Sequence, residues 1–239
     1  MNLILFAEQQ ARYTLSARDP RFEHVRGVLR MGVGEDFIVA AVNGPRGKAT
    51  IADLNAGQMD LSVVWEAQPM PPPPPIELLL AIPRPATARK VLFDATTLGV
   101  RTFHFFAAEK GDPAYAKSGL WTADEWRATV WRGAEQAFNS HLPEVRCRGT
   151  LGGALAELPT GGTRWALDVY EAEGHLAAGE PPRLPLVLAL GGERGWSRRE
   201  RETLRTAGFE LRGLGPRVLR VETAVTAALA VALGRMEAG

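Results

Sequence analysis

The fold is decided by the stretch Leu186-Val187-Leu188-Ala189-Leu190-Gly191-Gly192-Glu193-Arg194-Gly195-Trp196-Ser197. Its first five residues are apolar and end at glycines, which is typical of a buried strand over Leu186–Leu190. Ser197 and Glu200 have the spacing of a capping box, so a helix is expected to begin directly after the glycines. A buried strand, a glycine loop and a helix in succession predict a mostly parallel sheet with helices on both faces.

The same alternation runs through residues 76–239. Further strands are expected at Ile76–Ile82, Thr102–Ala107, Arg164–Tyr170 and Phe209–Leu214. Helices are expected over Ala86–Leu98, after a second capping box of Thr122 and Glu125, and from about Glu222. The inward faces of the last two helices are predicted from four-residue apolar spacing, namely Trp126, Val130, Ala134 and Phe138, then Val225, Leu229, Ala232 and Leu233.

The first 70 residues have a different pattern, with short alternating runs that predict a small β-rich module. Strands are expected at Phe37–Val42, Lys48–Ala52 and Asp60–Trp65, with turns at Asn43–Gly44 and Pro45–Gly47. A proline-rich segment, Pro71–Pro75, follows and should be extended and stiff, either as a linker or as a surface loop. The change of pattern favours a linker, so the expected domains are 1–70 and 76–239, joined by 71–75.

The charge and cysteine content limit the function classes. The net charge of +1 excludes a chain that binds nucleic acid over its whole surface, so any RNA contact must come from local clusters. Arginine outnumbers lysine 24 to 4, which suits phosphate binding but is explained equally by a GC-rich or thermophilic source. The single cysteine, Cys147, fits a reducing compartment, and no run approaches the ~18 apolar residues of a membrane span. We therefore expect a soluble, cytoplasmic protein.

Two glycine-rich segments, Gly191–Gly195 and Gly213–Gly215, each follow an expected strand. Ligands of parallel α/β sheets bind at the carboxyl ends of strands, where glycine lets the backbone approach a ligand closely. Each segment alone could be a plain turn, but two together favour a ligand cradle. Neither matches the dinucleotide fingerprint, and the chain has no phosphate loop and no nucleophile elbow. The histidines, His24, His104, His141 and His175, are scattered, so no metal site is expected.

The second glycine segment begins a stretch that resembles a known family. The run Leu214-Gly215-Pro216-Arg217-Val218-Leu219-Arg220-Val221-Glu222-Thr223-Ala224 closely resembles the C-terminal motif of the RsmE family, which methylates N3 of a uridine in small-subunit ribosomal RNA. Supporting similarities are His24–Arg30 with Gly32 and Gly34, Ala95–Val100, and Ala134–Gln136. The chain departs from the family pattern at Thr97, at Asn139 and in the loop Gly191–Gly195, where the family reads G-P-E-G-G.

The resemblance implies a fold and a cofactor. The C-terminal domain should be of the SPOUT class, an α/β domain with a trefoil knot, and the N-terminal domain should be a PUA-like β-barrel that binds RNA. A homodimer is implied, with S-adenosyl-L-methionine as cofactor and ribosomal RNA or the small ribosomal subunit as partner. The expected cofactor-binding residues are Leu190, Gly191, Gly192, Glu193, Gly195, Leu214, Gly215, Val218, Leu219, Thr223 and Ala224. The expected RNA-binding residues are Arg26, Arg30, Arg84, Arg194 and Arg217.

Two residues are the candidates for catalysis. Uracil N3 is weakly acidic and must lose its proton before it attacks, so a nearby cation should help; Arg220 is the first choice, with Arg217 and Arg194 as second choices. Alternatively, Arg220 could form an ion pair that stabilises the knot. Glu222 is the candidate proton acceptor, or else it stabilises the start of the last helix.

Three functions remain open from the sequence. The first is methylation of uridine N3 in small-subunit ribosomal RNA. The second is a SPOUT methyltransferase for a different RNA base, motivated by Thr97 and Asn139. The third is a non-enzymatic RNA-binding assembly factor that keeps the fold.

Overall fold

The computed structural model describes residues 3–237, which divide into two compact units. The first unit comprises Met1–Pro72 and Ala134–Leu142, and the second comprises Pro73–Gly133 and Pro143–Gly239. The division therefore falls inside the proline-rich segment, while residues 134–142 return to the first unit. Glu135 and Ser140 explain that return, because the Glu135 carboxylate accepts a hydrogen bond from the Leu5 N–H and Ser140 Oγ donates to the Gly44 carbonyl.

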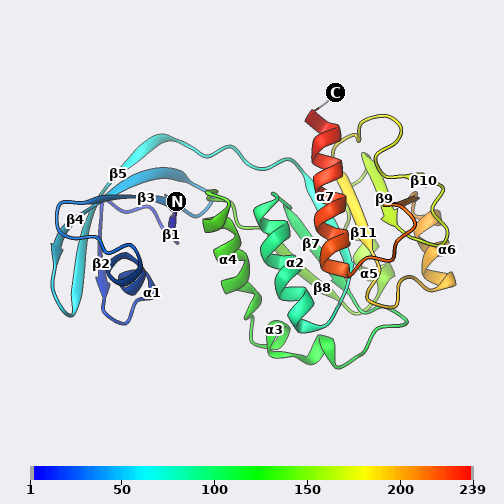
Figure 1. The fold of residues 1–239 in the computed structure, drawn as a ribbon, viewed down its shortest axis with the longest axis horizontal. Helices are drawn as coiled ribbons and strands as arrows, with labels where there is room; N and C mark the ends of the chain where they lie inside the picture. The colour runs from blue at the N-terminus through cyan, green and yellow to red at the C-terminus, as the bar shows by residue number, and fades with distance from the viewer. Residues whose placement is uncertain (1–2, 238–239) are drawn as a thin grey trace. The chain divides into compact units, whose positions relative to one another are not determined.

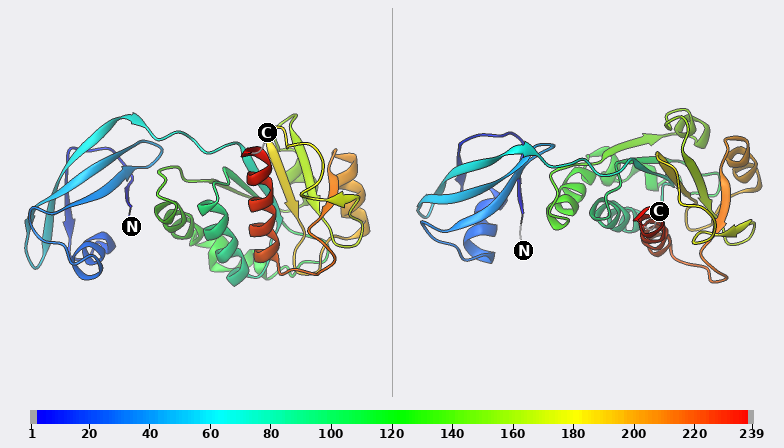
Figure 2. Two further views of the ribbon diagram at one scale, coloured as in Figure 1. Left: turned by 45° about the horizontal axis from the view of Figure 1, so that its top comes forward. Right: turned by 90° about the horizontal axis from the view of Figure 1, so that it is seen from above.

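The first unit is built on one curled sheet (Figures 1 and 2). Its strands are β1 (Ile4–Phe6), β2 (Arg12–Ser16), β3 (Asp36–Ala41), β4 (Pro45–Leu54) and β5 (Gln58–Pro69), in the order β1-β3-β4-β5-β2. All pairs are antiparallel except β1 with β3. A short helix, α1 (Pro20–Glu23), and a π-helical turn, η1 (His24–Val28), contribute Phe22 and Val25 to the core that the sheet encloses. This architecture confirms the PUA-like fold.

The β3–β4 turn corrects one expectation. Asn43 has a φ of 54°, as its turn position requires, but Pro45–Gly47 already belongs to β4. Gly47 is needed there for space and not for a turn, because a Cβ atom would lie 2.7 Å from the ring of Trp65 on the paired strand. A glycine that reads as a turn signal is here the site of a close side-chain approach.

The second unit contains a sheet in which every strand pair is parallel, as expected. Within the described residues its order is β10-β12-β9-β11-β6-β7-β8. The strands are β6 (Ile76–Ala81), β7 (Thr102–Phe106), β8 (Glu144–Arg148), β9 (Thr163–Leu167), β10 (Gly174–His175), β11 (Leu186–Leu190) and β12 (Glu210–Gly213). The helices are α2 (Pro85–Thr97), η2 (Tyr115–Lys117), α3 (Gly119–Thr122), α4 (Trp126–Gln136, whose end from Ala134 belongs to the first unit), α5 (Leu151–Leu155), α6 (Arg198–Thr206) and α7 (Val221–Glu237).

Helices cover both faces of this sheet because alternate strand residues point to opposite sides. Leu78 and Leu188 pack in one core with α2 and α7, which lie side by side (Figure 1). Leu79 and Val187 pack in the other core with α5 and α6. Val225, Leu229 and Ala232 of α7 are fully buried, as predicted for the inward face of the last helix.

The two predicted capping boxes had different outcomes. The Ser197–Glu200 box is present at the start of α6. The Thr122–Glu125 box is wrong, because Thr122 ends α3 and its hydroxyl donates back to the Ser118 carbonyl. Glu125 instead forms an ion pair with Arg89 of α2. The predicted apolar stripe after Thr122 holds at Val130 and Ala134, which are buried, but Phe138 lies beyond the end of α4 with a φ of 57°.

Within residues 3–237, α7 and the other helices are all too short or too polar to cross a membrane.

Candidate functional site

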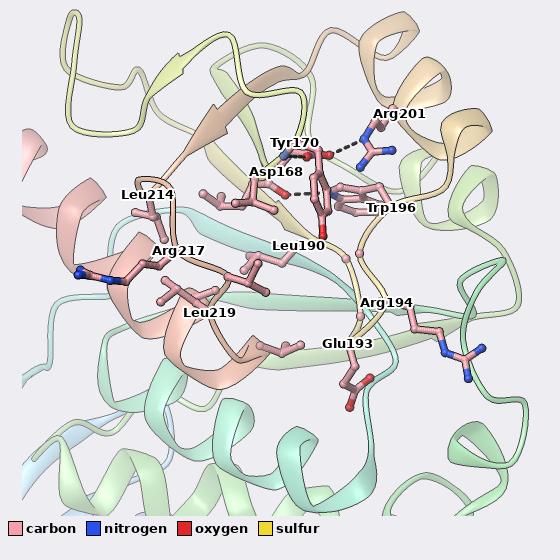
Figure 3. A pocket seen from close by; sticks show the side chains of 18 of the residues that line it. Asp168, Tyr170, Leu190, Glu193, Arg194, Trp196, Arg201, Leu214, Arg217 and Leu219 are labelled. Carbon is pink, nitrogen blue, oxygen red and sulfur yellow. Dashed lines mark hydrogen bonds and ion pairs between the residues drawn. The ribbon is translucent and has the colours of Figure 1, made fainter.

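The carboxyl ends of three adjacent strands, β12, β9 and β11, open onto one cavity of about 240 Å³. The loop after each strand supplies part of its wall (Figure 3). This volume is close to the lower end of the roughly 300–1,000 Å³ usual for small-molecule sites. The topology explains the place, because parallel neighbours end at the same edge of a sheet and their loops converge there.

The loop after β11, Gly191–Gly195, forms the first wall. Gly195 has a φ of +60°, and a Cβ atom on Gly191 would lie 2.9 Å from the Gly195 backbone, so the loop folds tightly on itself. Trp196 anchors its end, since its side chain is buried, its Nε1–H donates to the Leu167 carbonyl at 2.8 Å, and its ring stacks on Phe106. The loop is thereby fixed both to the neighbouring strand and to the core.

Glu193 connects this loop to a helix of the same unit. Its carboxylate accepts a hydrogen bond at 2.9 Å from the backbone N–H of Arg84, which precedes α2. Arg84 is the N-cap residue of α2 and supplies no side-chain cap, so Glu193 places negative charge at the helix N-terminus, where the helix dipole favours it. The Arg84 guanidinium donates to the Tyr115 hydroxyl at 3.1 Å.

The loop after β12 forms the opposite wall. Gly215 has a φ of +103°, a conformation that strongly favours glycine. The side chains of Val218 and Leu219 follow, 75% and 37% exposed. The loop ends where α7 begins, with the Ala224 N–H bonded to the Arg220 carbonyl.

The third wall, after β9, was not predicted from the sequence. The expected strand Arg164–Tyr170 stops at Leu167 because the Asp168 side chain takes over the next backbone donors. Its Oδ1 accepts from the N–H groups of Tyr170 at 2.6 Å and of Glu171 at 3.1 Å. Its Oδ2 accepts from Arg201 Nε at 2.5 Å. Burial alone would raise the pKa of Asp168, but the hydrogen bonds from Arg201 and the two N–H groups hold that pKa below its ordinary value.

Most of the predicted cofactor residues line the cavity. They are Leu190, Gly191, Gly192, Glu193, Gly195, Leu214, Gly215, Val218, Leu219 and Ala224. Thr223 is exposed on α7 and is not among the lining residues. The lining also includes residues that were not predicted, namely Leu167, Asp168, Val169, Tyr170, Trp196, Arg201 and Val221. The only local signal at the third loop was an Asp directly after a strand, a residue type that often makes such turns.

The candidate catalytic residues stand beside the cavity. Arg220 is exposed, between the lining residues Leu219 and Val221. Glu222 lies in the first turn of α7, and its carboxylate is 3.8 Å from Lys90 Nζ. Neither residue is part of the cavity lining.

The candidate RNA-binding arginines lie in both units. Arg194 and Arg217 line the cavity, and Arg84 lies at the start of α2. Arg26 and Arg30 are exposed in the first unit, in η1 and shortly after it.

Thr97 and Asn139, where the chain departs from the family pattern, both form local hydrogen bonds. The Thr97 hydroxyl donates to the Phe93 carbonyl, and Asn139 Oδ1 accepts from the His141 N–H.

Comparison with known proteins agrees with this architecture. An RNA methyltransferase domain model matches residues 70–233. Ribosomal RNA small subunit methyltransferase E of Treponema pallidum is 31% identical over all of this chain and 92% of that protein. The enzyme of that name from Synechocystis is 28% identical over 95% of this chain and 75% of that protein. The crystal structure of the Neisseria gonorrhoeae methyltransferase E, bound to S-adenosyl methionine, has a TM-score of 0.81 at 24% identity and covers 96% of this chain and 95% of that one.

The parallel sheet, its three-loop cavity and the matching domain model together define an RNA methyltransferase with a SPOUT-type fold. Within that class, the chain belongs to the ribosomal RNA small subunit methyltransferase E family.

Proposed function

We propose that this chain transfers a methyl group from S-adenosyl-L-methionine to N3 of a uridine in small-subunit ribosomal RNA. The single observation that carries the proposal is the convergence of three strand-end loops on one cavity in a member of this family. The relative from Neisseria gonorrhoeae binds S-adenosyl methionine, which supports the same cofactor here.

The residues present fit such a cofactor. The walls combine apolar side chains, Leu190, Leu214 and Leu219, with the bare backbone of two glycine segments. Apolar surfaces suit an adenine ring, and free backbone N–H and carbonyl groups can read its polar edge. A Cβ atom on Gly191 would collide with the Gly195 backbone, so a side chain at position 191 is excluded and backbone groups form the wall there. When bound, the cofactor supplies an electrophilic methyl group on a sulfonium.

The chain itself supplies orientation and charge. Arg220 extends from a backbone fixed by the start of α7, and its guanidinium would stabilise the uracil anion that forms when N3 gives its proton to solvent water. Glu222 pairs with Lys90 and stands in the first turn of α7, which supports a role at the helix start more than a role as the proton acceptor.

The remaining parts of the proposal concern the whole protein. The first unit is the RNA-binding domain and the second is the catalytic domain. The loops after β9, β11 and β12 belong to a trefoil knot, and the protein works in the cytoplasm as a homodimer. Family membership supports each of these statements.

The deciding experiment is methyl transfer to small ribosomal subunits from cells that lack this activity. Labelled cofactor should enter small-subunit ribosomal RNA, and mass spectrometry of nuclease fragments should find the methyl group on N3 of one uridine. A methyl group on another base would make the chain a SPOUT enzyme of different specificity. Cofactor binding by calorimetry without any transfer would favour the non-enzymatic assembly factor.

A further inference from the structure

Several arginines of the second unit are paired with a carboxylate, whereas others, among them Arg101 and Arg220, have no ion pair among the described residues. Arg89, Arg146, Arg148, Arg205 and Arg212 each form an ion pair with a glutamate. Arg194 and Arg217 line the cavity and are exposed, and within residues 3–237 no ion pair satisfies either one. Unpaired arginines on opposite loops of one opening leave a positive charge there that the protein itself does not neutralise.

An aromatic ring lies at the same opening. Tyr170 follows β9, lines the cavity and is 77% exposed, whereas its neighbour Val169 is 37% exposed. Figure 3 shows its ring extending from the loop toward Leu190 and the Gly191–Gly195 turn. Its neighbour Val169 and, across the opening, Val218 are also exposed.

The backbone that carries this ring is fixed. The Tyr170 N–H is bonded to Asp168 Oδ1, and Asp168 is held by the buried Arg201. Arg201 also approaches Glu171 at 3.5 Å, so both sides of Tyr170 are tied to one arginine. Packing does not explain the ring, because it is mostly exposed, and since the backbone is already fixed only the side-chain torsions of Tyr170 remain to be ordered on binding.

We propose that Tyr170 receives the target nucleotide by stacking on its pyrimidine ring, while Arg194 and Arg217 contact the phosphates on either side. The occupant is an unpaired nucleotide of RNA. Exposed aromatic faces flanked by unpaired arginines are what a splayed-out base and its phosphates require. This assignment rests on the proposed function and names the part of the site that takes the RNA.

The test for the Tyr170 ring distinguishes a contact with RNA from a contact with the cofactor. Tyr170→Leu keeps an apolar side chain but removes the π face, and it should lower kcat/KM for a ribosomal RNA fragment by about tenfold. Tyr170→Phe should recover most of that loss. The calorimetric Kd for S-adenosyl-L-methionine should change less than about twofold, and the melting temperature should stay constant because the side chain is exposed.

The test for the arginines uses the salt dependence of RNA binding. Arg194→Gln and Arg217→Gln should each reduce the slope of log K against log salt by about 0.7, the value for one phosphate contact with a single strand. The matched control is Arg101→Gln, an exposed arginine that precedes β7 at the opposite edge of the sheet and should leave the slope unchanged.

Three outcomes overturn the inference. If Tyr170→Leu weakens cofactor binding as much as RNA turnover, the ring belongs to the cofactor. If it changes neither quantity, or if the arginine variants keep the full salt slope, the mouth does not hold the RNA. An inactive wild-type protein with intact cofactor binding would instead count against the proposed function.

Discussion

Asp168 shows how one side chain can organise a wall of the cavity. Its two oxygens have different partners, since Oδ1 takes the N–H groups of the loop and Oδ2 takes Arg201. A buried carboxylate without partners would be costly, and here each oxygen is satisfied. The loop geometry therefore depends on the charged form of Asp168, which Arg201 stabilises.

We expect Asp168→Asn to lower the free energy of unfolding by about 3 kcal/mol at pH 7, because the buried Arg201 would lose its short ion pair and keep only the 3.5 Å contact with Glu171. The folded-state pKa lies below the unfolded value of roughly 3.9, so the carboxylate's contribution is complete above that pH and is lost as pH falls through the folded pKa. Urea unfolding at pH 7, 5 and 3 should show the difference from wild type shrinking only below about pH 4. Asp124→Asn, at an exposed ion pair, is the control and should change little. A difference that persists unchanged at pH 3 would contradict this expectation.

The role of Arg220 can be tested by measuring the turnover of Arg220 variants. Arg220→Ala should lower turnover by about 100- to 1000-fold, as for other preorganised electrostatic groups, while cofactor affinity changes less than about tenfold. Arg220→Lys should recover only part of the activity, because a point charge cannot replace the planar fork. Single-turnover kinetics and calorimetry measure the two quantities. A sharp fall in melting temperature, with activity following the folded fraction, would make Arg220 a brace of the loop instead.

Residues of the site could be predicted only where a local sequence pattern, such as a glycine-rich segment, indicated them. The glycine segments pointed to Leu190–Gly195 and Leu214–Leu219, and all of these residues except Pro216 do line the cavity. Asp168 and Arg201 are 33 positions apart, and their contact depends on β9 and α6 being brought together by the sheet. No spacing rule in one sequence contains that information. Tyr170 was not predicted as a site residue, because the sequence pattern placed it at the end of a strand.

At the scale of elements, the loops after β11 and β12 have different reasons for their glycines. Gly191 is restricted by space, since a Cβ atom there meets the Gly195 backbone. Gly215 is restricted by conformation, since its φ is +103° while a Cβ atom at that position would meet nothing within 4 Å. Strain and not collision is therefore the expected effect of a side chain at Gly215.

Gly215→Val should abolish binding of S-adenosyl-L-methionine in calorimetry while leaving most of the stability, because a β-branched residue disfavours the positive φ and reshapes only the loop. Gly234→Ala, on the exposed part of α7 with open space around it, is the matched control and should bind normally. Unchanged affinity in the valine variant would remove this loop from the cofactor site.

The elements themselves were largely predictable, and the failures share a cause. Leu186–Leu190 is a strand with the expected bounds, since an unbroken apolar run fits only a buried position. Thr122 and Glu125 match a capping box by spacing, but Asp124 between them adopts a φ of 52° and breaks the turn. Glu125 then forms an ion pair with Arg89 on α2, so this tertiary contact replaces the hydrogen bond that the capping box would have required of Glu125.

At the scale of the molecule, the expected dimer contacts need revision. The apolar stripes of the helix after Thr122 and of the last helix could each have supplied a dimer contact or packed in the core, and Val130, Ala134, Val225 and Leu229 are buried within the monomer. We still expect a homodimer on the basis of family resemblance. Sedimentation at micromolar concentration should give twice the 25.9 kDa chain mass. A monomer under those conditions would contradict this expectation.

The two compact units raise the question of whether one RNA contacts both. With a net charge of only +1, the chain as a whole attracts RNA weakly, so affinity should depend on a few arginines. If Arg26, Arg30, Arg84, Arg194 and Arg217 each meet one phosphate, the slope of log K against log salt should be about −3.5 for single-stranded RNA.

Double variants separate the contributions of the units. Arg26→Gln with Arg30→Gln, and Arg194→Gln with Arg217→Gln, should each reduce the magnitude of that slope by about 1.4. All four changes together should reduce it by about 2.8, because contacts on separate compact units are expected to be additive. A first pair without effect would mean that the first unit does not hold this RNA through these arginines. The methyl transfer site would then have to select its substrate through the second unit alone.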